Sequence, residues 1–96
     1  MIIVTGTVVA KPESFDALLA ESLAHVARSR AEDGCLSHAV TRDFEDPLRL
    51  FFFEQWRDRS ALDVHFRQPG SIAFVAALPE VVSAAGTLQI YEAQPV

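Results

Sequence analysis

Three side chains that lie close together in this sequence could act on an aromatic molecule. Glu54 and Trp56 end an apolar run, and His65 follows on a short predicted helix. An imidazole titrates near neutral pH, so it can remove a proton or donate a hydrogen bond to a developing oxyanion. An indole ring can stack on another ring. This combination could therefore hold a ring and remove a proton from it.

Each of these side chains also fits a purely structural role. Glu54 alternates with Leu50, Phe52 and Trp56 along a predicted strand. Its carboxylate must therefore find a backbone or arginine partner, or have its ionisation disfavoured. Trp56 fits ordinary core packing equally well, and His65 fits a buried imidazole satisfied by a neighbour. The residue pattern alone leaves these alternatives open.

The same pocket is predicted to have an apolar lining and one weaker polar contact. The expected lining residues are Phe52, Phe66, Phe74 and Leu78, and the polar contact is His38. His25 falls beside Glu21 on the outer side of the first predicted helix, which suggests a solvated side chain. The three histidines have no ligand-like spacing, and Cys35, predicted to be a buried structural thiol, has no partner cysteine. The sequence therefore predicts no metal site and no cofactor.

The elements that must position these residues follow a simple order. Periodicity predicts strands over residues 2–9, 36–42, 48–56 and 87–92. It predicts helices over residues 12–30 and 71–82, and the second of these should end or bend near Pro79. Between the third strand and the second helix it predicts a short helix that ends before residues 68–70. Either Asp58, or Ser60 paired with Asp63, would cap the short helix. The order β-α-β-β-α-β predicts a ferredoxin-like α+β domain over residues 1–96, with a four-stranded antiparallel sheet.

The predicted sheet is apolar on both faces. On the third strand Leu50, Phe52 and Trp56 point one way, whereas Phe51 and Phe53 point the other way. One set of helices can cover only one face, and an exposed patch of this kind is larger than monomers usually tolerate. We therefore expect a homodimer with two-fold symmetry that packs sheet against sheet.

Composition excludes several classes of function. The net charge is −5 and the arginines are scattered among acids, which argues against a nucleic-acid or anionic membrane partner. No apolar run approaches the length of a membrane-spanning helix. The first residues carry no basic region followed by an apolar one, so the sequence predicts a cytoplasmic protein.

Several short motifs, in their order and spacing, resemble the antibiotic biosynthesis monooxygenase family, and its quinol monooxygenase-like members in particular. The matching residues are Asp33-Gly34-Cys35-Leu36, Phe53-Glu54-Gln55-Trp56, and Ala61-Leu62 followed by His65. The resemblance covers nearly the whole chain. It implies a dimeric α+β barrel, a pocket between sheet and helices, and oxygenation of aromatic substrates without metal, flavin or haem.

The chain departs from the family at one position. Quinol monooxygenase-like members often carry another histidine after a proline, where this chain has Gly70 followed by Ser71. Two functions follow from the sequence. The first is a cofactor-independent monooxygenase that oxidises a quinol or related polyphenolic or polycyclic aromatic with O2, with His65 as the base and Trp56 holding the ring. The alternative is a non-catalytic dimer of the same fold that binds a small hydrophobic molecule.

Overall fold

A computed structural model describes all residues from 1 to 96. The chain forms a β-α-β-β-α-α-β series, with a single turn of 3-10 helix before the first α-helix. The elements are β1 (Ile2–Val9), η1 (Pro12–Ser14), α1 (Phe15–Arg30), β2 (Cys35–Arg42), β3 (Arg49–Trp56), α2 (Arg59–Phe66), α3 (Pro69–Val81) and β4 (Thr87–Glu92). None of the helices is both long and apolar enough to span a lipid bilayer.

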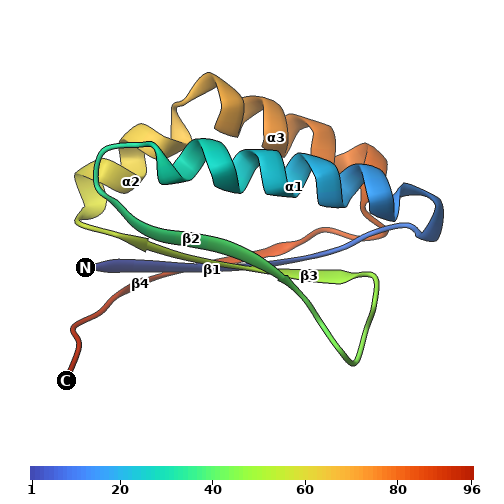
Figure 1. Cartoon of the computed structure of the whole chain (residues 1–96), viewed down its shortest axis with the longest axis horizontal. Helices are drawn as coiled ribbons and strands as arrows, with labels where there is room; N and C mark the ends of the chain where they lie inside the picture. The colour runs from blue at the N-terminus through green and yellow to red at the C-terminus, as the bar shows by residue number, and fades with distance from the viewer.

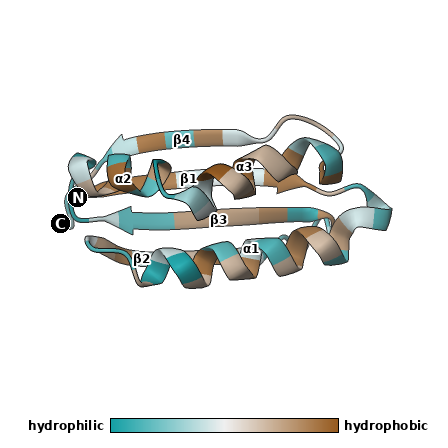
Figure 2. Cartoon of the chain, turned by 90° about the horizontal axis from the view of Figure 1, so that it is seen from above, coloured by the Kyte–Doolittle hydropathy of each residue, from teal (hydrophilic) through white to brown (hydrophobic).

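The four strands form one antiparallel sheet in the order β2-β3-β1-β4. All three helices lie on one side of this sheet, and the other side carries no covering element (Figure 1). The predicted ferredoxin-like α+β fold is therefore confirmed. Viewed from above, α1 follows β2, α3 lies nearer β1, and β4 remains outside the helix layer (Figure 2).

Local sequence explains where the short helices begin and end. The carboxylate of Asp58 accepts a hydrogen bond of 2.9 Å from the backbone N–H of Ala61, so Asp58 is the cap of α2 and Ser60 is not. Pro79 does not end α3, which continues to Val81. Because Pro79 lies in the last turn, its missing N–H removes a hydrogen bond only near the helix end.

Gly34 allows the turn between α1 and β2. Its φ is +83°, a left-handed conformation that side chains disfavour, and a Cβ at this position would lie 2.5 Å from the Cβ of Ala61. Cys35, the first residue of β2, is half-buried and not fully buried as the sequence suggested. Burial is the main cause that raises the pKa of its thiol, which disfavours the reactive thiolate.

The interior contains two separate apolar clusters. One is built from Val8, Ala10, Phe15, Leu18, Val26, Leu50, Phe52 and Phe74. The other is built from Ile2, Val4, Trp56, Ala61 and Leu62. On β3, Glu54 lies between Phe52 of the first cluster and Trp56 of the second. Buried polar side chains therefore interrupt the core at this point.

The two faces of the sheet differ as the alternation predicted. Leu50, Phe52 and Trp56 are buried beneath the helices, whereas Phe51 is 37% exposed and Phe53 is half-buried on the uncovered face. Leu88 of β4 lies on the side of the sheet that faces the helices. It is nevertheless 57% exposed, because β4 lies outside the helix layer (Figure 2). The sheet thus leaves one whole face and one flank of the other without cover.

Candidate functional site

A cavity of about 330 Å³ lies between the sheet and the helices α2 and α3. Its walls are mainly apolar, and one end carries polar side chains. The apolar lining includes Val8, Phe52, Phe66, Phe74, Val75, Leu78 and Leu88, and the polar end is formed by His25, Glu54, His65 and Ser71. A cavity of this size and character can hold a small aromatic molecule.

The structure brings most of the predicted site residues together at this cavity. Glu54, His65, Phe52, Phe66, Phe74 and Leu78 all line it. Trp56 and His38 do not, because both are buried behind the lining, with exposures of 0% and 1%. The expected role of Trp56 as a plate for a bound ring is therefore not supported, since the indole presents no face to the cavity.

Trp56 instead orients Glu54. The indole N–H donates a hydrogen bond of 2.9 Å to the Glu54 carboxylate. The other Glu54 neighbours are imidazoles: Nε2 of His38 lies 3.6 Å from one carboxylate oxygen and Nε2 of His65 lies 3.8 Å from the other. Burial raises the pKa of Glu54, against the opposing effects of the Trp56 hydrogen bond and of His65. The expected backbone or arginine partner of Glu54 is absent, and histidines take its place.

His65 is held by a second carboxylate. Its Nδ1 lies 3.0 and 3.1 Å from the two carboxylate oxygens of Glu32, and the hydroxyl of Ser71 is 3.5 Å away. A carboxylate can only accept, so we assign the proton to Nδ1, which leaves the lone pair on Nε2, facing Glu54. Sequence reasoning missed Glu32, because its position after α1 resembles that of any acid near a turn.

His25 is buried, which corrects the expectation of a solvated side chain. It is 7% exposed, and its ring stacks on Phe74 with a centroid distance of 4.4 Å. Burial, followed by the charges of His65 and Arg28, lowers the pKa of His25 to about 4. The prediction failed because α1 turns this side chain toward the cavity, beneath α3.

The structure gathers the three histidines, which are far apart in the sequence. The ring centroids of His25, His38 and His65 lie 5.3 to 5.8 Å apart. One ring nitrogen from each lies within 4.8 Å of the others. Burial lowers the pKa of His38 to about 3, with further contributions from His25, His65 and Arg30. The spacing of these histidines along the chain gave no sign of this arrangement, because it depends on how α1, β2 and α2 pack together.

Gly70 lies beside this polar end. A Cβ added at Gly70 would lie 2.5 Å from Nε of Arg28, so a side chain there requires the arginine to move. A smaller hollow of about 120 Å³ opens next to Gly70, lined by His25, Arg28, Glu32, Gln68, Gly70 and Ser71. The polar end of the main cavity therefore has a hydrophilic space on its outer side.

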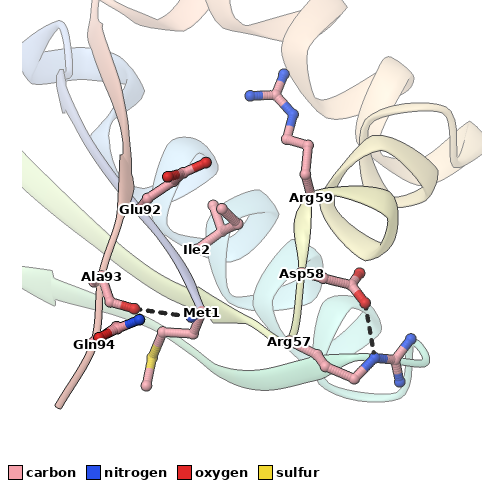
Figure 3. A pocket seen from close by; sticks show the side chains of 8 residues that line it. All are labelled: Met1, Ile2, Arg57, Asp58, Arg59, Glu92, Ala93 and Gln94. Carbon is pink, nitrogen blue, oxygen red and sulfur yellow. Dashed lines mark hydrogen bonds and ion pairs between the residues drawn. The ribbon is translucent and has the colours of Figure 1, made fainter.

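Another hollow, of about 520 Å³, lies at the end of the sheet where the two chain termini meet (Figure 3). The amino group of Met1 donates a hydrogen bond of 2.9 Å to the carbonyl of Ala93 there. Most lining side chains, including Arg57, Asp58 and Arg59, are exposed, and no histidine or aromatic residue contributes. This hollow lacks the groups that the proposed chemistry needs.

Comparison with known families gives an independent result. Residues 1–77 match the family model described as antibiotic biosynthesis monooxygenase. The chain belongs to this family. The match covers the cavity residues on β1, β3, α2 and most of α3, whereas β4 lies beyond it. The resemblance that the sequence motifs indicated is therefore confirmed.

Individual relatives and solved structures are similar to the chain over most of its length. An uncharacterized protein of Synechocystis is 34% identical over 91 residues, which are 95% of this chain and 62% of the relative, so the chain spans under two thirds of that protein. Rv0793 of Mycobacterium tuberculosis superposes with a TM-score of 0.92 at 26% identity, over 99% of this chain and 96% of that one. A candidate antibiotic biosynthesis monooxygenase from Deinococcus radiodurans gives a TM-score of 0.95 at 29% identity, with coverages of 100% and 95%.

Proposed function

We propose that this protein is a monooxygenase that binds a quinol or a related polyphenolic or polycyclic aromatic in the main cavity and oxidises it with O2 without a cofactor. One observation carries the proposal. His65 reaches the boundary between the apolar lining and the polar end, with Glu32 fixing the proton on Nδ1. The free Nε2 is therefore available as a base next to a space that suits an aromatic ring.

The reaction begins with a proton transfer. Nε2 of His65 removes the proton from a phenolic hydroxyl, and Glu32 stabilises the imidazolium that forms. The phenolate passes one electron to O2, and the resulting radical and superoxide join through a new C–O bond. The peroxide anion takes the proton back from His65 and becomes a hydroperoxide. His65 then removes the hydrogen from the carbon that carries the hydroperoxide, the O–O bond breaks, and the departing hydroxide takes this proton from His65 and leaves as water. The substrate loses two hydrogens, keeps one oxygen atom as a carbonyl, and releases the other as water.

The remaining cavity residues bind and shield the ring. Phe52, Phe66, Phe74 and Leu78 supply apolar surface that excludes water from the oxygen-sensitive anion. Glu54 lies 3.8 Å from Nε2 of His65, so it helps to position the imidazole. Trp56 and His38 contact or approach Glu54 and act through it. They are positioning residues in this proposal.

Oxygen uptake tests the proposal. Protein stripped of metal with EDTA should accelerate the oxidation of at least one member of a panel of reduced quinones and anthrones. His65→Ala should lower the rate by about 100-fold or more, the typical contribution of a general base. Val64→Ala, at an exposed neighbour on α2, should leave the rate unchanged. No acceleration by the native protein, or an unchanged rate in His65→Ala, would refute the proposal.

Gly70 favours the second candidate function, a non-catalytic binding protein. If the missing histidine at this position has removed the chemistry, the cavity can still bind a hydrophobic ring. Calorimetry with an oxidised, unreactive quinone would then show saturable binding, weakened by Phe74→Ala, while no oxygen is consumed with the reduced form. Oxygen uptake that depends on His65 would contradict this alternative.

We also propose that the protein is a homodimer that packs through the uncovered sheet face. Phe51 and Phe53 lie there beside Ile3, Val9 and Tyr91, on a face that no element of the chain covers (Figure 1). A second copy would remove this apolar surface from water. Sedimentation at micromolar concentration should show a dimer, and Phe53→Asp should shift it toward monomer. A native protein that sediments as a monomer would contradict the proposal.

A further inference from the structure

We propose that His25, His38, His65 and Glu54 form a binding site for one late first-row divalent metal ion, of which Zn²⁺ is the reference case. This metal site does not rest on the proposed oxygenation. Coordination through Nε2 of His65 would occupy the lone pair that the base needs. Bound metal would therefore inhibit the proposed reaction.

The positions of the ring nitrogens fit coordination. One nitrogen from each of the three histidines lies within 4.8 Å of the other two. Bonds of about 2.0–2.1 Å in a tetrahedral zinc site place ligand nitrogens roughly 3.3 Å apart. Closing three atoms from the observed separation to this one moves each by less than about 1 Å, which small side-chain rotations can supply. The three histidines come from three different elements, α1, β2 and α2.

The surroundings of His38 are a second, independent indication that an ion binds here. Its side chain is fully buried, and neither ring nitrogen has a hydrogen-bond partner. Leaving a buried polar group unpaired costs about 1–3 kcal/mol, so such groups are rare without a bound ion or water. Nε2 of His38 points toward Glu54 at 3.6 Å, a distance too long for a hydrogen bond. A metal ion between them would bind both.

The charges around the cluster also favour a cation. With the proton of His65 on Nδ1, the lone pair of Nε2 faces the Glu54 carboxylate at 3.8 Å, and both groups are acceptors. Arg28 and Arg30 oppose a cation from the rim, whereas Glu32 and Glu54 attract it from closer contacts. The buried cluster thus contains an acid without a compensating positive charge.

Glu32 would not bind the ion itself but would hold one of its ligands, His65, in place. In metal sites a coordinating histidine usually donates its other N–H to a carboxylate, which fixes the ring and raises its basicity. Nδ1 of His65 makes this bond to Glu32 at 3.0 Å. The hydrophilic hollow lined by His25, Glu32 and Ser71 gives an ion a polar route to the cluster. Imidazole nitrogens with one carboxylate oxygen suit Zn²⁺, Co²⁺, Ni²⁺ or Cu²⁺ and do not suit Mg²⁺ or Ca²⁺.

Calorimetry with Zn²⁺ on EDTA-treated protein tests the site, with Co²⁺ as a spectroscopic probe. We expect one ion per chain, and visible cobalt absorption bands typical of nitrogen ligands. His38→Gln should weaken binding by more than about 100-fold, and Glu32→Gln by roughly 10–100-fold, as for other outer partners. Cys35→Ser should bind as the native protein does, because Cys35 lies outside the cluster. Mg²⁺ should give no heat.

The metal site can still be tested if a histidine variant does not fold. His25→Gln, at the rim of the cluster, is the second variant, and circular dichroism establishes which proteins are folded. If neither histidine variant folds, the cobalt spectrum of the native protein decides, since carboxylate ligands alone give no such bands. No binding of Zn²⁺ at 100-fold excess, or binding that survives both histidine substitutions, would overturn the proposal.

The two proposals fail in different ways. If the metal site is absent, the EDTA-treated protein still oxidises its substrate, and added Zn²⁺ does not slow it. If the oxygenation is absent, Zn²⁺ still binds with the same dependence on His38. Where both hold, Zn²⁺ should inhibit oxygen uptake at the concentration at which it saturates the calorimetric site. Mg²⁺ at the same concentration is the matched control.

Discussion

The interior of this protein joins two regions of opposite character. The apolar clusters, one around Leu50 and Phe52 and one around Trp56 and Leu62, bury side chains that need no polar partner. The polar cluster between them buries imidazoles and a carboxylate, some without a hydrogen bond. Apolar burial stabilises a fold, whereas buried polar groups with incomplete partners destabilise it. We infer that the apolar regions maintain the structure and that the polar cluster is retained for its chemistry.

The largest effect on stability should come from shortening a side chain in an apolar cluster. Leu50 is fully buried in the larger apolar cluster. Leu50→Ala should lower the free energy of unfolding by about 2–5 kcal/mol, because it leaves a cavity as well as losing apolar burial. Urea unfolding measures the change. Phe44→Ala is the control, since the Phe44 side chain is exposed in the β2–β3 loop and its removal should change little. A loss below about 1 kcal/mol for Leu50→Ala would contradict the assignment.

Lowering the pH should reduce the free energy of unfolding through the polar cluster and not through the apolar clusters. In metal-free protein the pKa values of His25 and His38 are lowered to about 4 and about 3, so the unfolded chain binds protons more readily than the folded one. The stability from these neutral imidazoles is present above pH 6.5 and is lost as pH falls toward these values. The loss should be on the order of 3 kcal/mol for each histidine.

The raised pKa of Glu54 acts in the opposite direction, because protonation of this carboxyl is easier in the folded protein, and it offsets part of that loss. Urea titrations of the EDTA-treated protein between pH 7 and 5 measure the slope, within the window set by the cited shifts. His38→Leu should flatten it. A slope that is unchanged in His38→Leu would show that other groups cause the acid sensitivity.

The smallest expected effect compares two serines on α1. Both are fully buried, but Ser29 donates a hydrogen bond of 2.8 Å to the carbonyl of His25, whereas the hydroxyl of Ser22 has no partner. Ser29→Ala should lower the free energy of unfolding by about 1 kcal/mol, and Ser22→Ala should raise it by a similar amount. Thermal unfolding of the two variants gives the comparison. Equal shifts in the same direction would mean that the Ser22 hydroxyl has a partner in solution.

The fold could be predicted from the sequence because its signals are local. Alternation along β1 and β3, the periodic face of α1 and the turn at Gly34 depend on neighbouring residues, and these elements lie within a residue or a few of the predicted bounds. The order of these elements along the chain then predicted the ferredoxin-like arrangement. The choice between Asp58 and Ser60 as a helix cap needed the structure, since both residue types can accept the same backbone bond.

The site was less accessible to such reasoning. His65 and the aromatic lining were predicted because they share helix and strand faces with apolar neighbours. Glu32 and His25 were missed, because their roles depend on contacts with His65 on α2 and Phe74 on α3 and not on the residues beside them. Trp56 was placed in the cavity on the chemistry of its ring, whereas its packing against His65 and its hydrogen bond to Glu54 turn it into support. Contacts between distant segments leave no pattern in a single sequence.

The exposed flank of β4 has a consequence for motion. This strand pairs only with β1, every one of its side chains is exposed, and Leu88 forms part of the cavity wall. Segments with few buried contacts open at a free-energy cost well below that of global unfolding. Amide protons of β4 should therefore exchange with solvent faster than those of β3, which is paired on both sides. Under the proposed function, local opening of this edge strand is a route by which a ring would enter the cavity.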